Sequence, residues 1–76
     1  MKLYFENSRG VRRLIGEPET RTAANKMVHD FCKAHNYDGY YIRNWIWEGE
    51  LVYDVGSWSE FFYLANDDST PMTLGE

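Results

Sequence analysis

Residues 40–47 read YYIRNWIW, a run rich in the aromatic and β-branched side chains that favour a β-strand. In a strand, successive side chains point to opposite faces of the sheet. One face then holds the two isoleucines, in the set Tyr40, Ile42, Asn44 and Ile46. The opposite face holds Tyr41, Arg43, Trp45 and Trp47. Because the isoleucine set is the better match to a helix packed on the sheet, the aromatic set is expected to point outward.

Four further strands are predicted around this one. A turn at residues 48–50 leads into a strand over 51–55, and a turn at 56–59 leads into a strand over 60–65. Near the start of the chain, residues 3–6 and 11–15 are expected to form a hairpin. The Asn-Ser-Arg-Gly sequence between them tolerates the positive φ angles of a tight turn.

Residues 20–35 carry the helix signal of the chain. Thr20 or Thr22 can cap its N-terminus, and Pro18 with a glutamate on either side suits a helix start. Apolar side chains recur at spacings of three and four residues, which places one apolar stripe along the helix. The members of this stripe are Ala24, Met27, Val28, Phe31, Cys32 and, at its end, His35.

These elements predict an α+β fold with the order ββαβββ, in which an antiparallel sheet carries one helix packed on one face. The chain has 76 residues, which suits one small domain. We expect a single domain over residues 1–66, followed by a C-terminal tail over 67–76, because a polar stretch ends the last strand.

The outward aromatic set indicates a binding surface. Aromatic residues make up 17% of the chain, which is more than a core of this size needs. One helix covers one face of a sheet, and the other face meets water unless a partner covers it. Tyr, Trp and Arg are enriched at binding hot spots, and Tyr41, Arg43, Trp45 and Trp47 gather them on one strand. Two alternatives stay open: the aromatics fill the core, or they form a homodimer interface.

Charge is divided unevenly along the chain. Residues 1–47 carry a formal net charge of +3, whereas residues 48–76 carry −7 and contain no Lys or Arg. Four carboxylates of the acidic half lie on or beside two strands expected to bracket the aromatic strand. They are Glu48, Glu50, Asp54 and Glu60. With the aromatic anchors, they predict docking on a protein with a basic surface, unless the two halves fold together and their charges intermix.

Single-stranded nucleic acid is an alternative partner. Outward Tyr and Trp side chains beside Arg43 resemble a stacking platform for bases. Arg9, Arg12 and Arg13 would then supply phosphate contacts. Since Arg12 and Arg13 are adjacent in a strand, either one of them points to the core side or the strand lies at a sheet edge. The pI of about 5.0 and the acidic strands disfavour a phosphate backbone.

A metal site is not expected. His29, Cys32 and His35 follow a His-x-x-Cys-x-x-His spacing that resembles a ligand set. On a helix, however, the three side chains span a wide arc, and the chain has no further His or Cys to complete the site. A buried Cys32 beside two histidines without a metal role is the expected arrangement.

Catalysis is not expected either. Ser57 and Ser59 lack the Gly-x-Ser-x-Gly elbow that exposes a nucleophilic serine, and no Gly-rich phosphate loop occurs. Asp54 and Glu60 can approach each other across a hairpin, but carboxylates in such places are usually solvated. We therefore expect a protein that is not an enzyme and needs no cofactor.

The sequence predicts a cytoplasmic protein that does not enter the membrane. The single cysteine excludes an internal disulfide framework and suits a reducing compartment. The apolar runs are far shorter than the roughly 20 residues of a membrane span. The first residues, Met-Lys-Leu-Tyr-Phe-Glu, contain no apolar signal core.

Several short segments resemble proteins encoded by phages and prophages of Gram-positive bacteria. They are residues 1–10 (MKLYFENSRG), 13–15 (RLI), 29–32 (HDFC), 40–41 (YY), 54–57 (DVGS) and 60–62 (EFF). The resemblance covers residues 1–63 and carries no catalytic signature. It implies a small phage factor in the host cytoplasm that binds and modulates a host protein without catalysis. Inhibitors of bacterial defence, including anti-CRISPR proteins that bind a CRISPR nuclease, belong to that class. A self-associating phage structural or assembly component is the other alternative function.

Overall fold

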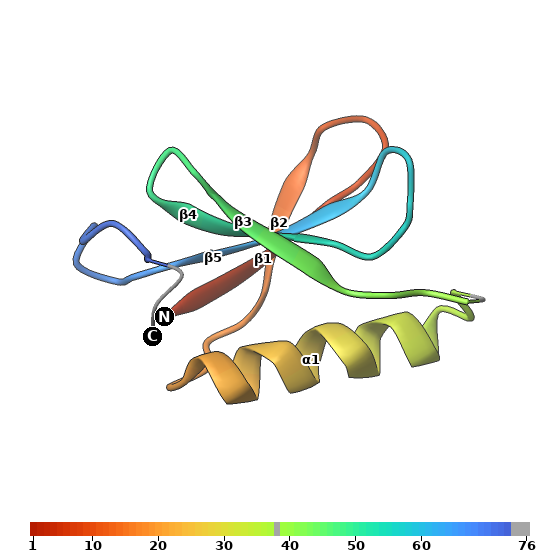
Figure 1. Cartoon of the computed structure of the whole chain (residues 1–76), viewed down its shortest axis with the longest axis horizontal. Coiled ribbons are helices and arrows are strands. Elements are labelled where there is room, and N and C mark those ends of the chain that lie inside the picture. Colours follow the sequence, from red (N-terminus) through yellow and green to blue (C-terminus); the bar gives the residue numbers. More distant parts are fainter. Residues whose placement is uncertain (38, 74–76) are drawn as a thin grey trace.

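A five-stranded sheet and one helix make up the fold (Figure 1). The computed structural model describes residues 1–37 and 39–73. In chain order the elements are β1 (Lys2–Glu6), β2 (Arg12–Gly16), α1 (Arg21–Ala34), β3 (Arg43–Trp47), β4 (Glu50–Asp54) and β5 (Phe61–Ala65). All paired strands are antiparallel. The predicted α+β class with the order ββαβββ is confirmed.

The strand order in the sheet is β2-β1-β5-β4-β3, so the first and last strands of the chain are neighbours. β1 pairs with β5 from Lys2 opposite Ala65 to Glu6 opposite Phe61. This pairing leaves β3 at one edge of the sheet, where β4 is its single neighbour among the described strands. The expectation that two strands bracket the aromatic strand is therefore wrong, because strand order is set by a long-range contact that no local pattern encodes.

The buried residues of α1 belong to the predicted apolar stripe. The hydroxyl oxygen of Thr20 accepts a hydrogen bond from the N–H of Ala23 at 3.0 Å, so Thr20 is the cap. Ala24, Val28 and Cys32 are fully buried against the sheet. His35 lies just past the helix end and is exposed, and its ring stacks on that of Phe31 with the centroids 3.9 Å apart.

Three phenylalanine rings join the helix to the sheet. The ring centroid of Phe31 in α1 lies 4.6 Å from that of Phe5 in β1 and 5.1 Å from that of Phe62 in β5. The rings of Phe5 and Phe62 are 5.2 Å apart, and aromatic rings at such distances attract each other beyond the burial of their area. The other large side chains of this buried cluster are Leu3, Val28, Leu51, Tyr53, Val55, Leu64 and Met72. The helix therefore covers one face of the sheet and leaves the other uncovered (Figure 1).

The segment after Asn66 contributes to the core. Met72 is 7% exposed and belongs to the buried cluster. Its N–H donates to the carbonyl oxygen of Gly49, in the turn between β3 and β4, at 2.9 Å. Met72 thus packs in the core although it lies beyond the domain boundary expected at residue 66. The described part of the segment is attached to the domain. Residues 74–76 of the expected tail lie outside the described residues.

Shortening Met72 tests this attachment. Met72→Ala removes most of a buried side chain and leaves a cavity, so the free energy of unfolding is expected to fall by about 2 to 3 kcal/mol. Met72→Leu keeps the volume and is expected to cost less than about 1.5 kcal/mol. Urea unfolding followed by tryptophan fluorescence measures both changes. Equal unfolding midpoints for Met72→Ala and the parent protein would show that the segment does not pack on the domain.

Candidate interaction surface

The sheet face opposite α1, called the helix-free face below, holds alternate residues of every strand. Antiparallel residues that directly oppose each other share a face. One row across this face is Leu14, Tyr4, Tyr63, Val52 and Trp45. The next row is Arg12, Glu6, Phe61, Asp54 and Arg43. Lys2, Ala65, Glu50 and Trp47 complete the face.

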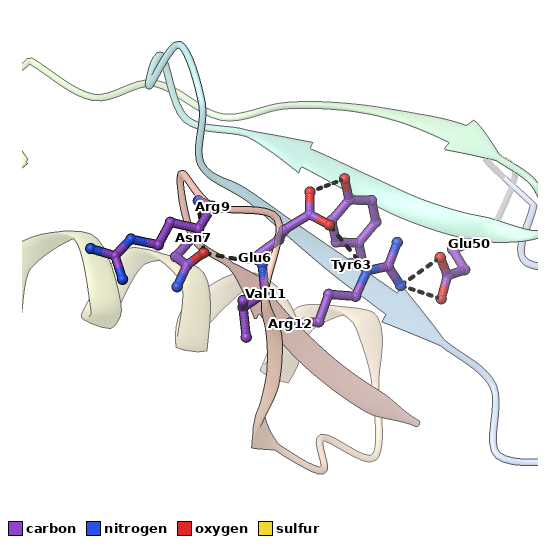
Figure 2. Close-up of polar contacts among 7 residues, drawn as sticks. All are labelled: Glu6, Asn7, Arg9, Val11, Arg12, Glu50 and Tyr63. Atoms are coloured by element: carbon purple, nitrogen blue, oxygen red, sulfur yellow. Dashed lines mark hydrogen bonds and ion pairs between the residues drawn. The ribbon is translucent and has the colours of Figure 1, made fainter.

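Arg12 reaches from the edge strand β2 across the sheet to β4 (Figure 2). Its guanidinium carbon lies 3.6 Å from the ring centroid of Tyr63, and its Nη1 donates to both carboxylate oxygens of Glu50, at 3.0 and 3.1 Å. Its Nε lies 3.6 Å from Glu6, whose other oxygen accepts a hydrogen bond from the Tyr63 hydroxyl at 3.0 Å. Burial and the bond to Glu6 raise the pKa of Tyr63. Arg12 therefore covers the Tyr63 ring on this half of the helix-free face, whereas Leu14 of β2 is 47% exposed.

The ionic groups of the helix-free face balance each other. The described strands place three basic and three acidic side chains on it, namely Lys2, Arg12, Arg43, Glu6, Glu50 and Asp54. Arg12 pairs with Glu6 and Glu50, and Arg43 pairs with Asp54 at 2.8 Å. The basic and acidic halves of the chain thus intermix here. Glu50 and Asp54 are held by arginines and do not form an acidic surface of their own.

Exposed aromatic side chains gather at the other half of the face. Trp45 and Trp47 of β3 are 38% and 59% exposed, and Tyr41, just before β3, is 49% exposed. Trp58, in the loop between β4 and β5, is 99% exposed. Tyr41, Arg43 and Trp58 line one open hollow of about 340 Å³. These residues, Tyr41, Arg43, Trp45, Trp47 and Trp58, are called the aromatic surface below.

Contacts within the chain hold Tyr41 and Arg43 in place. Gly56 has a φ of +90°, and a Cβ at this position would lie 3.0 Å from the Tyr41 ring, so glycine permits both the turn and the close approach of the ring. The guanidinium of Arg43 lies 5.4 Å from the centroid of the same ring. Asp54 binds Arg43 at 2.8 Å and accepts the N–H of Gly56 at 2.9 Å. Burial alone would raise the pKa of Asp54, but these hydrogen bonds and the Arg43 charge outweigh it and lower that pKa.

Trp58 is the member of the aromatic surface that sequence reasoning missed. It lies between two serines in a turn, where neither alternation nor helical periodicity assigns a face. The signal available in the sequence was its residue type, since tryptophan is enriched at binding hot spots. Only the folded chain brings this turn beside Tyr41 and Arg43.

The remaining acidic candidates lie apart from each other. Glu48 is exposed in the turn between β3 and β4, next to Trp47. Glu60 accepts hydrogen bonds from the hydroxyls of Tyr37 at 3.1 Å and Ser57 at 3.2 Å. Burial and the bond to Glu60 raise the pKa of Tyr37 to about 12. Glu60 thus anchors the segment after the helix and is not part of the aromatic surface.

The three arginines of the nucleic-acid alternative do not form one cluster. Arg12 is engaged on the helix-free face, whereas Arg13 opposes Phe5 and so belongs to the other side of β2. Arg9 lies in the turn before β2, and its side chain is directed away from Arg12 (Figure 2). Since β2 is an edge strand, both adjacent arginines stay exposed.

The histidines and the cysteine have structural neighbours. Cys32 is buried, which raises the pKa of its thiol. The Nδ1 of His29 lies 3.0 Å from the hydroxyl of Tyr40, and the Nδ1 of His35 lies 2.9 Å from the carbonyl oxygen of Phe31. Within residues 1–37 and 39–73, no three His, Cys, Asp or Glu side chains are grouped as metal ligands would be. No helix in the same part of the chain has the length and apolar character of a membrane span.

Comparison of the chain with protein-family models, with curated proteins and with solved structures found no match.

The pairing of Arg43 with Asp54 predicts a pH dependence. A carboxyl whose pKa is lowered by folding adds stability above its unfolded pKa of about 3.9, and this stability is lost as the pH falls through the folded pKa. Arg43→Met removes the partner while burial persists, so the pKa of Asp54 is expected to rise. The variant should be less stable than the parent at pH 7, and the difference should shrink below about pH 4.

Carboxyl NMR titration of Asp54 measures this change directly. Arg12→Met is the matched control, because it removes the partner of Glu50 and Glu6 and leaves Arg43 in place. An Asp54 pKa that is the same in Arg43→Met as in the parent would contradict the assigned ion pair.

Proposed function

We propose that this protein acts by binding another protein through the aromatic surface, without catalysing a reaction. The observation that carries the proposal is the exposure of Trp47, Trp58 and Tyr41 around Arg43. Burial of one such side chain contributes roughly 2 kcal/mol or more. Tyr, Trp and Arg are the residue types that dominate binding hot spots, and here they adjoin one hollow.

Aromatic contact carries more of the proposed binding than charge does. Two of the four carboxylates expected to meet a basic partner, Glu50 and Asp54, are neutralised by arginines of the same chain. Glu60 is engaged with Tyr37 and Ser57. Glu48 is the one of the four that lies exposed beside Trp47, so the preference for a basic partner surface rests on Glu48 and on the net charge of −4.

The resemblance of residues 1–63 to phage and prophage proteins supplies the biological setting of the proposal. In that setting the partner is a host protein in the bacterial cytoplasm. A component of bacterial defence, such as a CRISPR nuclease, is the class of target that such a factor inhibits or modulates.

Capture from a lysate of a Gram-positive bacterium, with and without nuclease, tests the proposal. The parent protein is expected to retain a host protein in both arms. Trp47→Ala with Trp58→Ala is expected to lose it, since truncation at a hot spot costs about 2 kcal/mol, or roughly thirtyfold in Kd. Val11→Ala is the matched control, because Val11 is also exposed, at 58%, but lies before β2 at the opposite edge. Circular dichroism verifies that each variant is folded.

The outcomes separate the classes of partner. Capture that disappears with nuclease would overturn the proposal in favour of nucleic acid. Equal capture by the tryptophan variant would show that the aromatic surface does not bind the partner.

Once a partner is purified, Glu48→Lys is expected to weaken binding to a basic partner severalfold without disturbing Arg12 or Arg43.

A further inference from the structure

The two edges of the sheet differ in their protection against another strand. β2 carries adjacent Arg12 and Arg13, and its register with β1 shifts at Leu3 and Tyr4. Charged side chains and register irregularities are devices that keep edge strands from pairing with other chains. β3, at the other edge, reads RNWIW and pairs with β4 in regular register over all five residues. It contains no Lys and no Pro, and four of its five residues are exposed.

The backbone of β3 has groups ready to pair. Glu48 and Gly49 have φ angles of +50° and +79°, as in the two-residue turn that closes a tight hairpin. In such a hairpin the flanking pair, Trp47 and Glu50, is hydrogen-bonded, and hydrogen-bonded pairs alternate along the ladder. Asn44 and Ile46 therefore direct their N–H and C=O groups away from β4, toward the open edge.

On the side of the helix, the described residues leave this edge open. Asn44, on the side of the helix, is exposed. An open hollow of about 270 Å³, lined by Arg21, Asn25 and Asn44 among others, separates the first turns of α1 from β3. The helix thus stops short of the edge, and another strand has room beside β3.

We propose that β3 pairs antiparallel with β3 of a second copy of this chain, about a two-fold axis at Trp45, so that the two sheets become one. This is the two-fold register in which all five residues of β3 oppose a residue of β3 in the other copy. Asn44 of each copy exchanges backbone hydrogen bonds with Ile46 of the other. The pairing is independent of which protein the aromatic surface binds.

Side-chain chemistry favours a second copy as the occupant. On the helix-free face, Trp45 opposes Trp45 of the second copy, and Arg43 opposes Trp47 of the second copy. Aromatic pairs and guanidinium–indole pairs across strands are both attractive. The basic end of each strand, at Arg43, also approaches the acidic turn of the other copy, at Glu48, so the charges are complementary.

The pairing would place two aromatic surfaces on one continuous sheet. Trp58 and Tyr41 of each copy lie beyond the paired residues and stay exposed for a partner. A surface built from two chains would then present each partner-binding residue twice, which adds avidity toward a partner with repeated or symmetric sites.

Light scattering on the purified protein, from about 1 µM to about 500 µM, tests the pairing. The expected mass rises toward twice the 9.0 kDa of one chain. Asn44→Pro removes an outward N–H at an edge, where proline is tolerated, and is expected to stay monomeric. Asn44→Thr keeps the N–H and is the matched control, expected to dimerise like the parent.

A cysteine pair tests the register without proline. Trp45→Cys is expected to form an intermolecular disulfide on mild oxidation, because non-hydrogen-bonded partners have Cα atoms about 4.5 Å apart. Trp47→Cys is the control, since its counterpart in the second copy lies about 13 Å further along the strand. Cys32 is fully buried and does not compete.

Three results would overturn the pairing. The first is a mass of 9.0 kDa at every concentration. The second is an Asn44→Pro variant that forms a dimer as stable as the dimer of the parent protein. The third is a Trp47→Cys variant that cross-links as readily as Trp45→Cys. Because the purified protein alone is measured, these results do not depend on whether the proposed host partner exists.

Discussion

The packing of Phe31 against Phe5 and Phe62 is the contact on which the rest of the molecule depends. It fixes which face of the sheet receives the one helix and, by strand alternation, which side chains are turned away from it. A chain of 76 residues has no second layer within its described part to cover that other face. The surface features described above depend on which side chains lie on this uncovered face.

The two halves of the uncovered face differ in how their aromatic rings are covered. Toward β2, the long side chain of Arg12 lies over Tyr63 and binds Glu50, so apolar stems and paired charges replace a second layer. Toward β3, Trp45 and Trp47 are 38% and 59% exposed. The boundary between the two halves is Val52, which is 3% exposed between Tyr63 and Trp45. The aromatic surface is therefore a local property of one end of the sheet.

The edge position of β3 joins the two proposals. An edge strand with exposed aromatic residues offers side chains to a partner and backbone groups to another strand. Arg43 takes part in both, since Asp54 holds it at the border of the hollow and β3 places it opposite Trp47 in the proposed pairing.

Local patterns in the sequence were sufficient for the elements, the helix stripe and the alternation that turns Arg43, Trp45 and Trp47 away from the core. These features depend on contacts between residues a few positions apart, which periodicity encodes. The tertiary structure alone decided the pairing of β1 with β5, and with it the edge position of β3, the meeting of Arg12 with Glu50 and the place of Trp58 beside Tyr41. Each of these joins residues distant in the chain, whose approach is settled by the burial of the whole core and not by any local preference.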